Sequence, residues 1–116
     1  MIKNILIIED DDNLASILSN YLKAKDYLTQ IATNQKQALG KFSSDTDICI
    51  VDTGLYNAEI FTLVKELKNK VNGMPFIYIS NKTTTAKIQA DDIDEIIEKP
   101  FTLNDILANI EKIKNK

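Results

Sequence analysis

The sequence predicts an α/β domain in which a five-stranded parallel sheet is covered by helices on both faces. Short apolar runs alternate with amphipathic stretches along the whole of its 116 residues. The runs are continuously apolar rather than alternating, which is typical of parallel strands buried on both faces. The stretches between the runs are long enough for the helical crossovers that parallel strands require.

The predicted strands are short and rich in isoleucine, valine and aromatic residues, and they cover residues 4–9, 27–33, 47–52, 75–80 and 93–99. Pro75 opens the fourth of them, and proline is tolerated at the first residue of a strand. Cys49 lies inside the third strand, where we expect a buried core residue without redox activity.

The predicted helices follow the strands. In the first of them, apolar residues recur at helical spacing and form one face, which comprises Leu14, Ile17, Leu18, Tyr21 and Leu22. Further helices are expected over residues 35–42, 58–71, 83–91 and 102–116. The helix over 83–91 has weak support, because residues 83–85 are three β-branched threonines. Thr102 or Asn104 is the expected N-cap of the last helix.

Composition restricts the class of protein. A chain of 116 residues with 44% hydrophobic and 27% charged residues suits one globular domain, which we expect to span residues 1–116. The single cysteine excludes an internal disulfide and fits a reducing cytoplasm. No apolar run is long enough to span a membrane. The net charge of −3 argues against nucleic-acid binding by this domain.

The chain has no histidine, and all 14 of its basic residues are lysines. This composition excludes a serine–histidine triad, a histidine general base and histidine metal ligands. One cysteine cannot build a zinc site. The chemistry must therefore come from carboxylates, hydroxyls, lysines and a hard cation.

Polar residues end four of the five predicted strands, and such sheets bind ligands at the carboxyl ends of their strands. These residues are Glu9, Asp10, Asp52, Ser80 and Lys99. Converging carboxylates raise one another's pKa unless a cation lies among them, and Mg²⁺ is the hard cation that suits one or two carboxylates and several waters. A metal and an ammonium group would neutralise phosphoryl oxygens, so Asp52 is the candidate nucleophile for an acyl-phosphate.

In sequence the chain resembles the receiver domain of bacterial two-component response regulators, from about residue 3 to its end. The matching pieces are "ILIIEDD", "ICIVD", "PFIYIS" and "EKPF", in the family's order and at roughly its spacing. The resemblance implies a flavodoxin-like, doubly wound (βα)5 sandwich with strand order 2-1-3-4-5. It also implies a phosphoryl-accepting switch of a phosphorelay, served by a sensor histidine kinase or a phosphotransfer protein.

The resemblance assigns a role to each motif position. Glu9 and Asp10 would hold Mg²⁺ together with Asp52 and the backbone carbonyl of Gly54. Asp52 would accept the phosphoryl group from the partner's phosphohistidine. The domain would catalyse its own phosphorylation and slow dephosphorylation without being a turnover enzyme.

The remaining motif positions concern the switch. Ser80 would turn toward the phosphoryl group, and Lys99 would pair with it. The bond between Lys99 and Pro100 is usually cis in the family. Phosphorylation would shift the face formed by residues 83–91, 93–99 and 102–116, where the output is usually read.

The chain departs from the family around this site. The departures are Tyr56, Glu59, Ile60, Asn81, Asp92, Ile93 and Ile96, the last of which replaces a common aromatic switch partner. The segment between Ser80 and Lys99 is also a few residues shorter than usual. Dimers of one large DNA-binding subfamily use arginines on the output face, and lysine cannot copy a bidentate arginine pair. A homodimer would therefore form differently or couple differently to the switch.

Other interpretations stay open. Asp11, Asp12 and Asn13 are better explained as caps and dipole partners of the following helix than as ligands. A receiver-like binding module that works without phosphorylation is the alternative function. An aspartyl-phosphate phosphatase is disfavoured, because such enzymes need a second acid where Gly54 stands. An effector domain outside this chain would carry the output.

Overall fold

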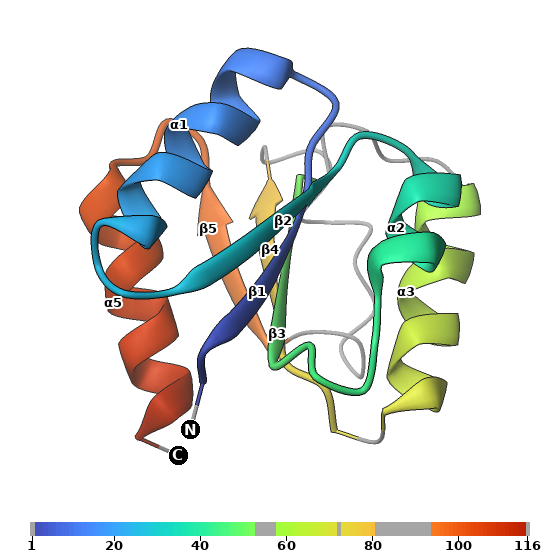
Figure 1. Cartoon of the computed structure of the whole chain (residues 1–116). Helices are drawn as coiled ribbons and strands as arrows, with labels where there is room; N and C mark the ends of the chain where they lie inside the picture. Colours follow the sequence, from blue (N-terminus) through green and yellow to red (C-terminus); the bar gives the residue numbers. More distant parts are fainter. Residues whose placement is uncertain (1, 53–57, 72, 81–93, 116) are drawn as a thin grey trace.

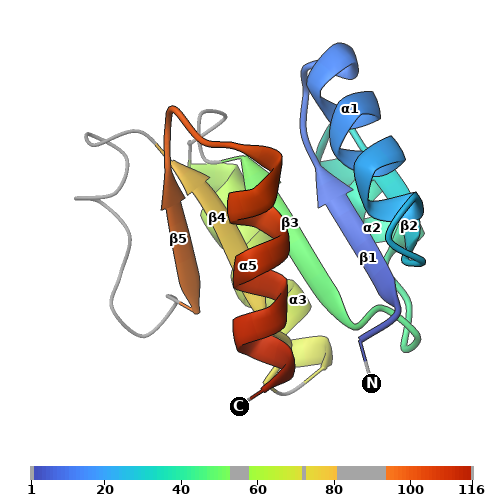
Figure 2. The ribbon, with the colours of Figure 1, turned by 90° about the vertical axis from the view of Figure 1, so that its left-hand side faces the viewer.

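The computed structural model describes residues 2–52, 58–71, 73–80 and 94–115 (Figure 1). Its centre is a parallel sheet in the order β2-β1-β3-β4-β5, as the sequence predicts. The strands are β1 (Asn4–Ile8), β2 (Leu28–Ala32), β3 (Ile48–Asp52), β4 (Phe76–Ser80) and β5 (Glu95–Glu98). The helices are α1 (Asp12–Lys23), α2 (Gln35–Lys41), α3 (Ala58–Lys70) and α5 (Leu103–Lys114). α1 and α5 cover one face of the sheet, and α2 and α3 cover the other (Figures 1 and 2).

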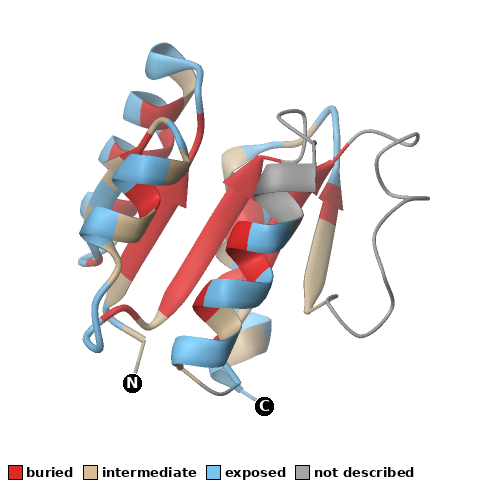
Figure 3. Ribbon diagram, turned by 90° about the vertical axis from the view of Figure 1, so that its right-hand side faces the viewer, coloured by how far each residue is buried: buried red, intermediate tan, exposed pale blue. Residues whose placement is uncertain are grey.

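The apolar runs form strands because helices bury them from both sides. All five residues of β3 and all five of β4 are buried (Figure 3). On the α2–α3 face, strand side chains such as Leu6 and Val51 pack with Leu63 and Leu67 of α3. On the opposite face, Ile5, Ile7 and Ile50 pack against residues of α1 and α5, such as Leu18 and Ile106. Burial at ~25 cal/mol per Å² of apolar surface is the main stabilising contribution.

The helix starts follow local capping rules. Asp11 is the N-cap of α1, where its side chain accepts hydrogen bonds from the backbone N–H groups of Asn13 and Leu14. Thr102 caps α5 in a capping box with Asp105, which decides between the two predicted candidates. Such caps contribute about 1 kcal/mol each.

Where the structure describes them, the predicted element bounds agree with the observed ones to within two residues. Glu9 and Lys99, which were expected to end their strands, follow β1 and β5 by one residue. Ile17 was expected on the buried face of α1, but 52% of its surface is exposed. This part of the expectation is wrong, because α1 buries the face that carries Ala15, Leu18, Ser19 and Leu22, and Ile17 lies toward the opposite side of the helix. The expected helix over residues 83–91 lies outside the described residues.

Asp47 fixes the chain at the amino ends of the strands, which is the end of the sheet remote from their carboxyl ends. Its Oδ2 atom accepts hydrogen bonds from the backbone N–H groups of Lys3 and Asn4, at 2.9 and 2.8 Å. The described chain begins and ends on this side of the molecule, away from the carboxyl ends of the strands (Figure 1). No helix in the described part of the chain is long and apolar enough to cross a membrane.

Candidate functional site

Four of the predicted site residues lie at the carboxyl ends of neighbouring strands. We call this end of the sheet the carboxyl edge. Asp52 is the last residue of β3, and Ser80 is the last residue of β4. Glu9 follows β1 and donates its backbone N–H to the carbonyl of Ala32 at 2.9 Å. Lys99 follows β5 and donates its backbone N–H to the carbonyl of Ser80 at 2.8 Å. Parallel pairing brings these residues, distant in sequence, to one edge.

An ion pair joins two of these residues. The Nζ atom of Lys99 lies 3.1 Å from Oδ2 of Asp52. Only 6% of the Asp52 side chain is exposed, whereas 38% of the Lys99 side chain is. A buried carboxylate requires a compensating charge, and the lysine supplies it from the solvent side. The lysine itself remains partly solvated.

Glu9 is a buried acid beside Asp52. Only 2% of its surface is exposed. Its Oε1 atom accepts a hydrogen bond from the backbone N–H of Asp11 at 3.2 Å, whereas its buried Oε2 atom has no hydrogen-bond partner among the described residues. Burial, followed by the neighbouring Asp52 carboxyl, raises the pKa of Glu9 from 4.5 to about 8. One lysine can compensate only one of two adjacent buried carboxylates, so a second positive charge would stabilise the pair in its ionised form.

The donor set of the edge fits magnesium. Glu9 offers a buried oxygen without a partner among the described residues, Asp52 offers a second carboxylate, and the exposed Asp10 follows Glu9 in sequence. Within the described ranges, no three acidic, cysteine or histidine side chains are grouped closely enough to ligate a metal by themselves. Mg²⁺ does not need such a group, because it keeps several waters and uses one or two carboxylates. Gly54, whose carbonyl was the other expected ligand, lies outside the described residues.

Ser80 and Ile96, the residues that the resemblance links to the switch, differ from one another in burial. Ser80 is fully buried at the end of β4 and is held beside β5 by the Lys99 backbone. Ile96 is partly buried in β5 and packs against the α2–α3 side of the core. The peptide bond between Lys99 and Pro100 is cis. Asn81, like Tyr56, lies outside the described residues.

An apolar groove borders the site, and the sequence analysis did not anticipate it. It has a volume of about 680 Å³ and lies between α1 and the start of α5, lined by Leu14, Ile17, Lys99, Pro100, Phe101 and Leu103. Helical periodicity assigned Ile17 to the core and so concealed its place on this surface. The groove shares Lys99 with the carboxyl edge.

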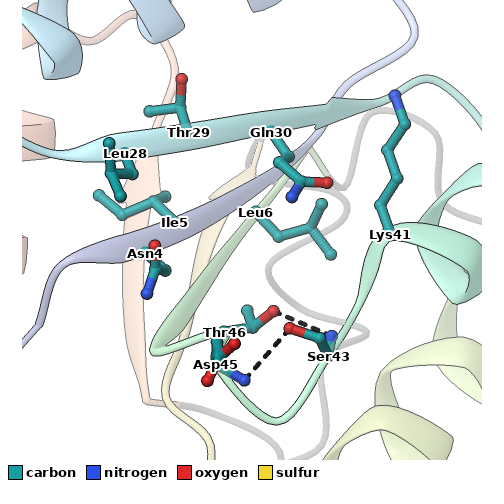
Figure 4. A pocket seen from close by; sticks show the side chains of 10 residues that line it. All are labelled: Asn4, Ile5, Leu6, Leu28, Thr29, Gln30, Lys41, Ser43, Asp45 and Thr46. Carbon is teal, nitrogen blue, oxygen red and sulfur yellow. Dashed lines mark hydrogen bonds between the residues drawn. The ribbon is translucent and has the colours of Figure 1, made fainter.

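A second hollow, of about 250 Å³, lies between β1, β2 and the segment that follows α2 (Figure 4). Part of its polar lining is hydrogen-bonded within the protein. The Ser43 backbone N–H donates to Thr46 Oγ1, the Asp45 backbone N–H donates to Ser43 Oγ, and Lys41 donates to the Ile31 carbonyl. It contains none of the carboxyl-edge residues, and we assign no ligand to it.

The strand order and the polar carboxyl edge define a flavodoxin-like, doubly wound α/β protein with a site at the ends of its strands. The family model described as "Response regulator receiver domain" matches residues 5–111. The chain therefore belongs to the receiver domain family of two-component response regulators.

Individual relatives agree with this family. The chain is 26% identical over 113 residues to the response regulator SaeR of Staphylococcus aureus, an alignment that covers 95% of this chain and 50% of SaeR. The chain thus spans about half the length of the curated relatives that it matches.

Solved structures share the fold. A two-component response regulator from Clostridium difficile is 25% identical, with a TM-score of 0.83 and coverage of 98% of this chain and 97% of that chain. TrrA from Thermotoga maritima, solved in complex with Mg(2+)-BeF, is 23% identical, with a TM-score of 0.82 and coverage of 96% and 98%. The second likeness shows the fold alone.

Proposed function

We propose that this chain is a phosphoryl-accepting switch in which Asp52 takes a phosphoryl group from the phosphohistidine of a partner kinase or phosphotransfer protein. An Asp52 oxygen forms a bond to phosphorus while the phosphorus–nitrogen bond breaks. The imidazole leaves with that electron pair and takes up a proton. The observation that carries this proposal is the buried Asp52 carboxylate, which is paired with Lys99 at 3.1 Å and lies beside Glu9.

Each residue at the edge has a defined part in this transfer. Lys99 leaves the carboxylate and follows the negative charge that arrives on the phosphoryl oxygens. Glu9, Asp10 and the carbonyl of Gly54 would hold Mg²⁺ with Asp52. The ion would supply charge neutralisation of the phosphoryl oxygens and a template for in-line approach.

The signal would leave through Ser80 and the neighbouring strand. The hydroxyl of Ser80 would turn toward the new phosphoryl group, and the hydrogen bond between the Lys99 backbone and the Ser80 carbonyl would carry that movement into β5. The chain covers only half of its curated relatives, which supports an effector domain beyond the receiver domain as the output.

The test is phosphorylation by a small-molecule donor. The protein is incubated with acetyl phosphate and Mg²⁺, and its intact mass is measured. We expect the mass of one added phosphoryl group, lost in Asp52→Asn and when a chelator removes the metal. A wild-type protein whose mass stays unchanged at saturating donor would instead favour a binding module that does not use phosphorylation.

A further inference from the structure

Asp94 lies one residue before β5 and joins that strand to two other elements. Its Oδ2 atom accepts a hydrogen bond from the backbone N–H of Phe76 at 2.8 Å, at the start of β4. The same atom lies 2.7 Å from Nζ of Lys68, in the last turn of α3. The Asp94 side chain is 29% exposed and that of Lys68 is 21% exposed, so the cluster is largely shielded from solvent.

β5 is a short edge strand of four residues that, in the described structure, pairs with β4 and forms an ion pair with α5 through Glu95 and Lys112 at 3.4 Å. Only Ile97 of these four residues is buried. Register is strongly specified where a whole face is buried and weakly specified in short, partly exposed strands. Polar anchors at the ends of such a strand therefore matter more than they would in β3 or β4.

The two ends of β5 are both anchored to β4. At the carboxyl end, the Lys99 backbone N–H donates to the Ser80 carbonyl at 2.8 Å. At the other end, the Asp94 carboxylate accepts a hydrogen bond from the Phe76 backbone N–H, which faces β5. The carboxylate oxygen thus accepts the bond that a backbone carbonyl would accept if the β4–β5 ladder continued. These two bonds bracket the pairing from Ile77 with Glu95 to Ser80 with Glu98.

The position of Lys99 depends on this pairing, because β5 delivers Lys99 to Asp52. A slip by one residue would move it by about 3.3 Å and reverse the faces of the strand. We propose that Asp94 is a positioning residue for phosphoryl transfer: it holds β5 in the register that places the Lys99 ammonium at Asp52. This inference rests on the proposed function and adds a residue that lies outside the receiver motif.

Three variants separate the two contacts of Asp94. Asp94→Ala removes the acceptor for the Phe76 N–H, and Asp94→Asn keeps an amide oxygen there while it removes the charge. Lys68→Met removes the positive charge of the ion pair but keeps a long side chain over the Phe76 ring. In the wild type, the Nζ atom of Lys68 lies 5.3 Å from the centroid of that ring. We expect phosphorylation by acetyl phosphate to slow about tenfold in Asp94→Ala, because small misplacements at a reacting centre carry large rate losses. Asp94→Asn and Lys68→Met should stay within about twofold of wild type.

The decisive measurement is a double variant. If Asp94 acts through Lys99, then Asp94→Ala should slow wild type but should not slow Lys99→Ala further. Hydrogen exchange of the Lys99 amide should also accelerate in Asp94→Ala and stay slow in Asp94→Asn, in variants shown to be folded by their thermal unfolding.

Each contrary outcome is distinguishable. If wild type is phosphorylated at the same rate as Asp94→Ala, or if the Asp94 and Lys99 losses multiply, the positioning role is wrong and the proposed function stands. If wild type takes no phosphoryl group at all, the proposed function fails and the positioning role fails with it.

Discussion

Glu9 and Asp52 place two buried carboxyl groups side by side at the ends of β1 and β3, with 2% and 4% of their surfaces exposed. One of them is paired with Lys99, and the other keeps a buried oxygen without a partner in the described structure. This arrangement is unfavourable for an ion-free protein and favourable for one that binds a cation. Its consequences can be measured without any partner protein.

Magnesium should stabilise the folded protein. A ligand that binds only the folded state adds about 1.4 kcal/mol to the free energy of unfolding at ten times its Kd. We therefore expect Mg²⁺ to raise the Tm of wild type and to raise it much less in Glu9→Gln, measured by differential scanning calorimetry. The exposed residue Asp12 lies in the first turn of α1, so Asp12→Asn serves as the matched control and should keep the full shift. A wild-type Tm that ignores Mg²⁺ at high millimolar concentration would contradict the metal assignment.

Without magnesium, stability should fall as pH rises from about 4.5 to about 8. The unfolded carboxyl of Glu9 loses its proton near 4.5, whereas the folded one, with its raised pKa, keeps it up to about 8. Between these values the folded state binds more protons, so the free energy of unfolding decreases with pH and levels off above 8. Urea unfolding in chelator across this range measures the effect. Glu9→Gln should lose most of this slope, and an unchanged slope would show that other groups cause it.

The apolar groove should bind the surface of the phosphoryl donor protein. Ile17 lines it with 52% of its surface exposed, so Ile17→Glu places a charge there without disturbing the core. We expect transfer from a phosphorylated kinase domain to slow at least about tenfold, since burying an unpaired charge costs several kcal/mol. Phosphorylation by acetyl phosphate should not change.

Ser16→Glu adds the same charge to the exposed side of α1, outside the groove, and is the matched control. Equal slowing by both variants would indicate a general charge effect. Slowing with acetyl phosphate as well would indicate damage to the site itself.

Cys49 should report unfolding. It has no exposed surface, and burial raises the pKa of its thiol to about 12. Since the thiolate is the reactive form, a thiol reagent at pH 8 should modify only molecules whose sheet has opened. The modification rate should therefore rise with urea in proportion to the unfolded fraction. Fast modification of the native protein would show that β3 opens locally.

Local sequence patterns predicted the strands and most of the helices, and with them the residues at the strand ends, because these depend on neighbours in the chain. The predicted run over residues 47–52 forms β3 from residue 48, and all five residues of β3 are buried, with Asp52 at the carboxyl edge. The exposure of Ile17 was not predicted, because apolar spacing alone does not show which side of α1 faces the sheet, and the structure buries the side with Ala15, Leu18 and Leu22. The contacts of Asp94 could not be predicted from the sequence either, because its partners, Lys68 and Phe76, belong to other elements.

The contact of Asp47 with the backbone of Lys3 and Asn4 has a practical consequence. It fixes the incoming chain at the end of the sheet remote from Asp52, and the last turn of α5 lies on the same side (Figure 1). A molecule tethered to a sensor chip or a resin through either end would therefore present Asp52, Lys99 and the apolar groove to the solution. Donor proteins can be screened against it in that orientation.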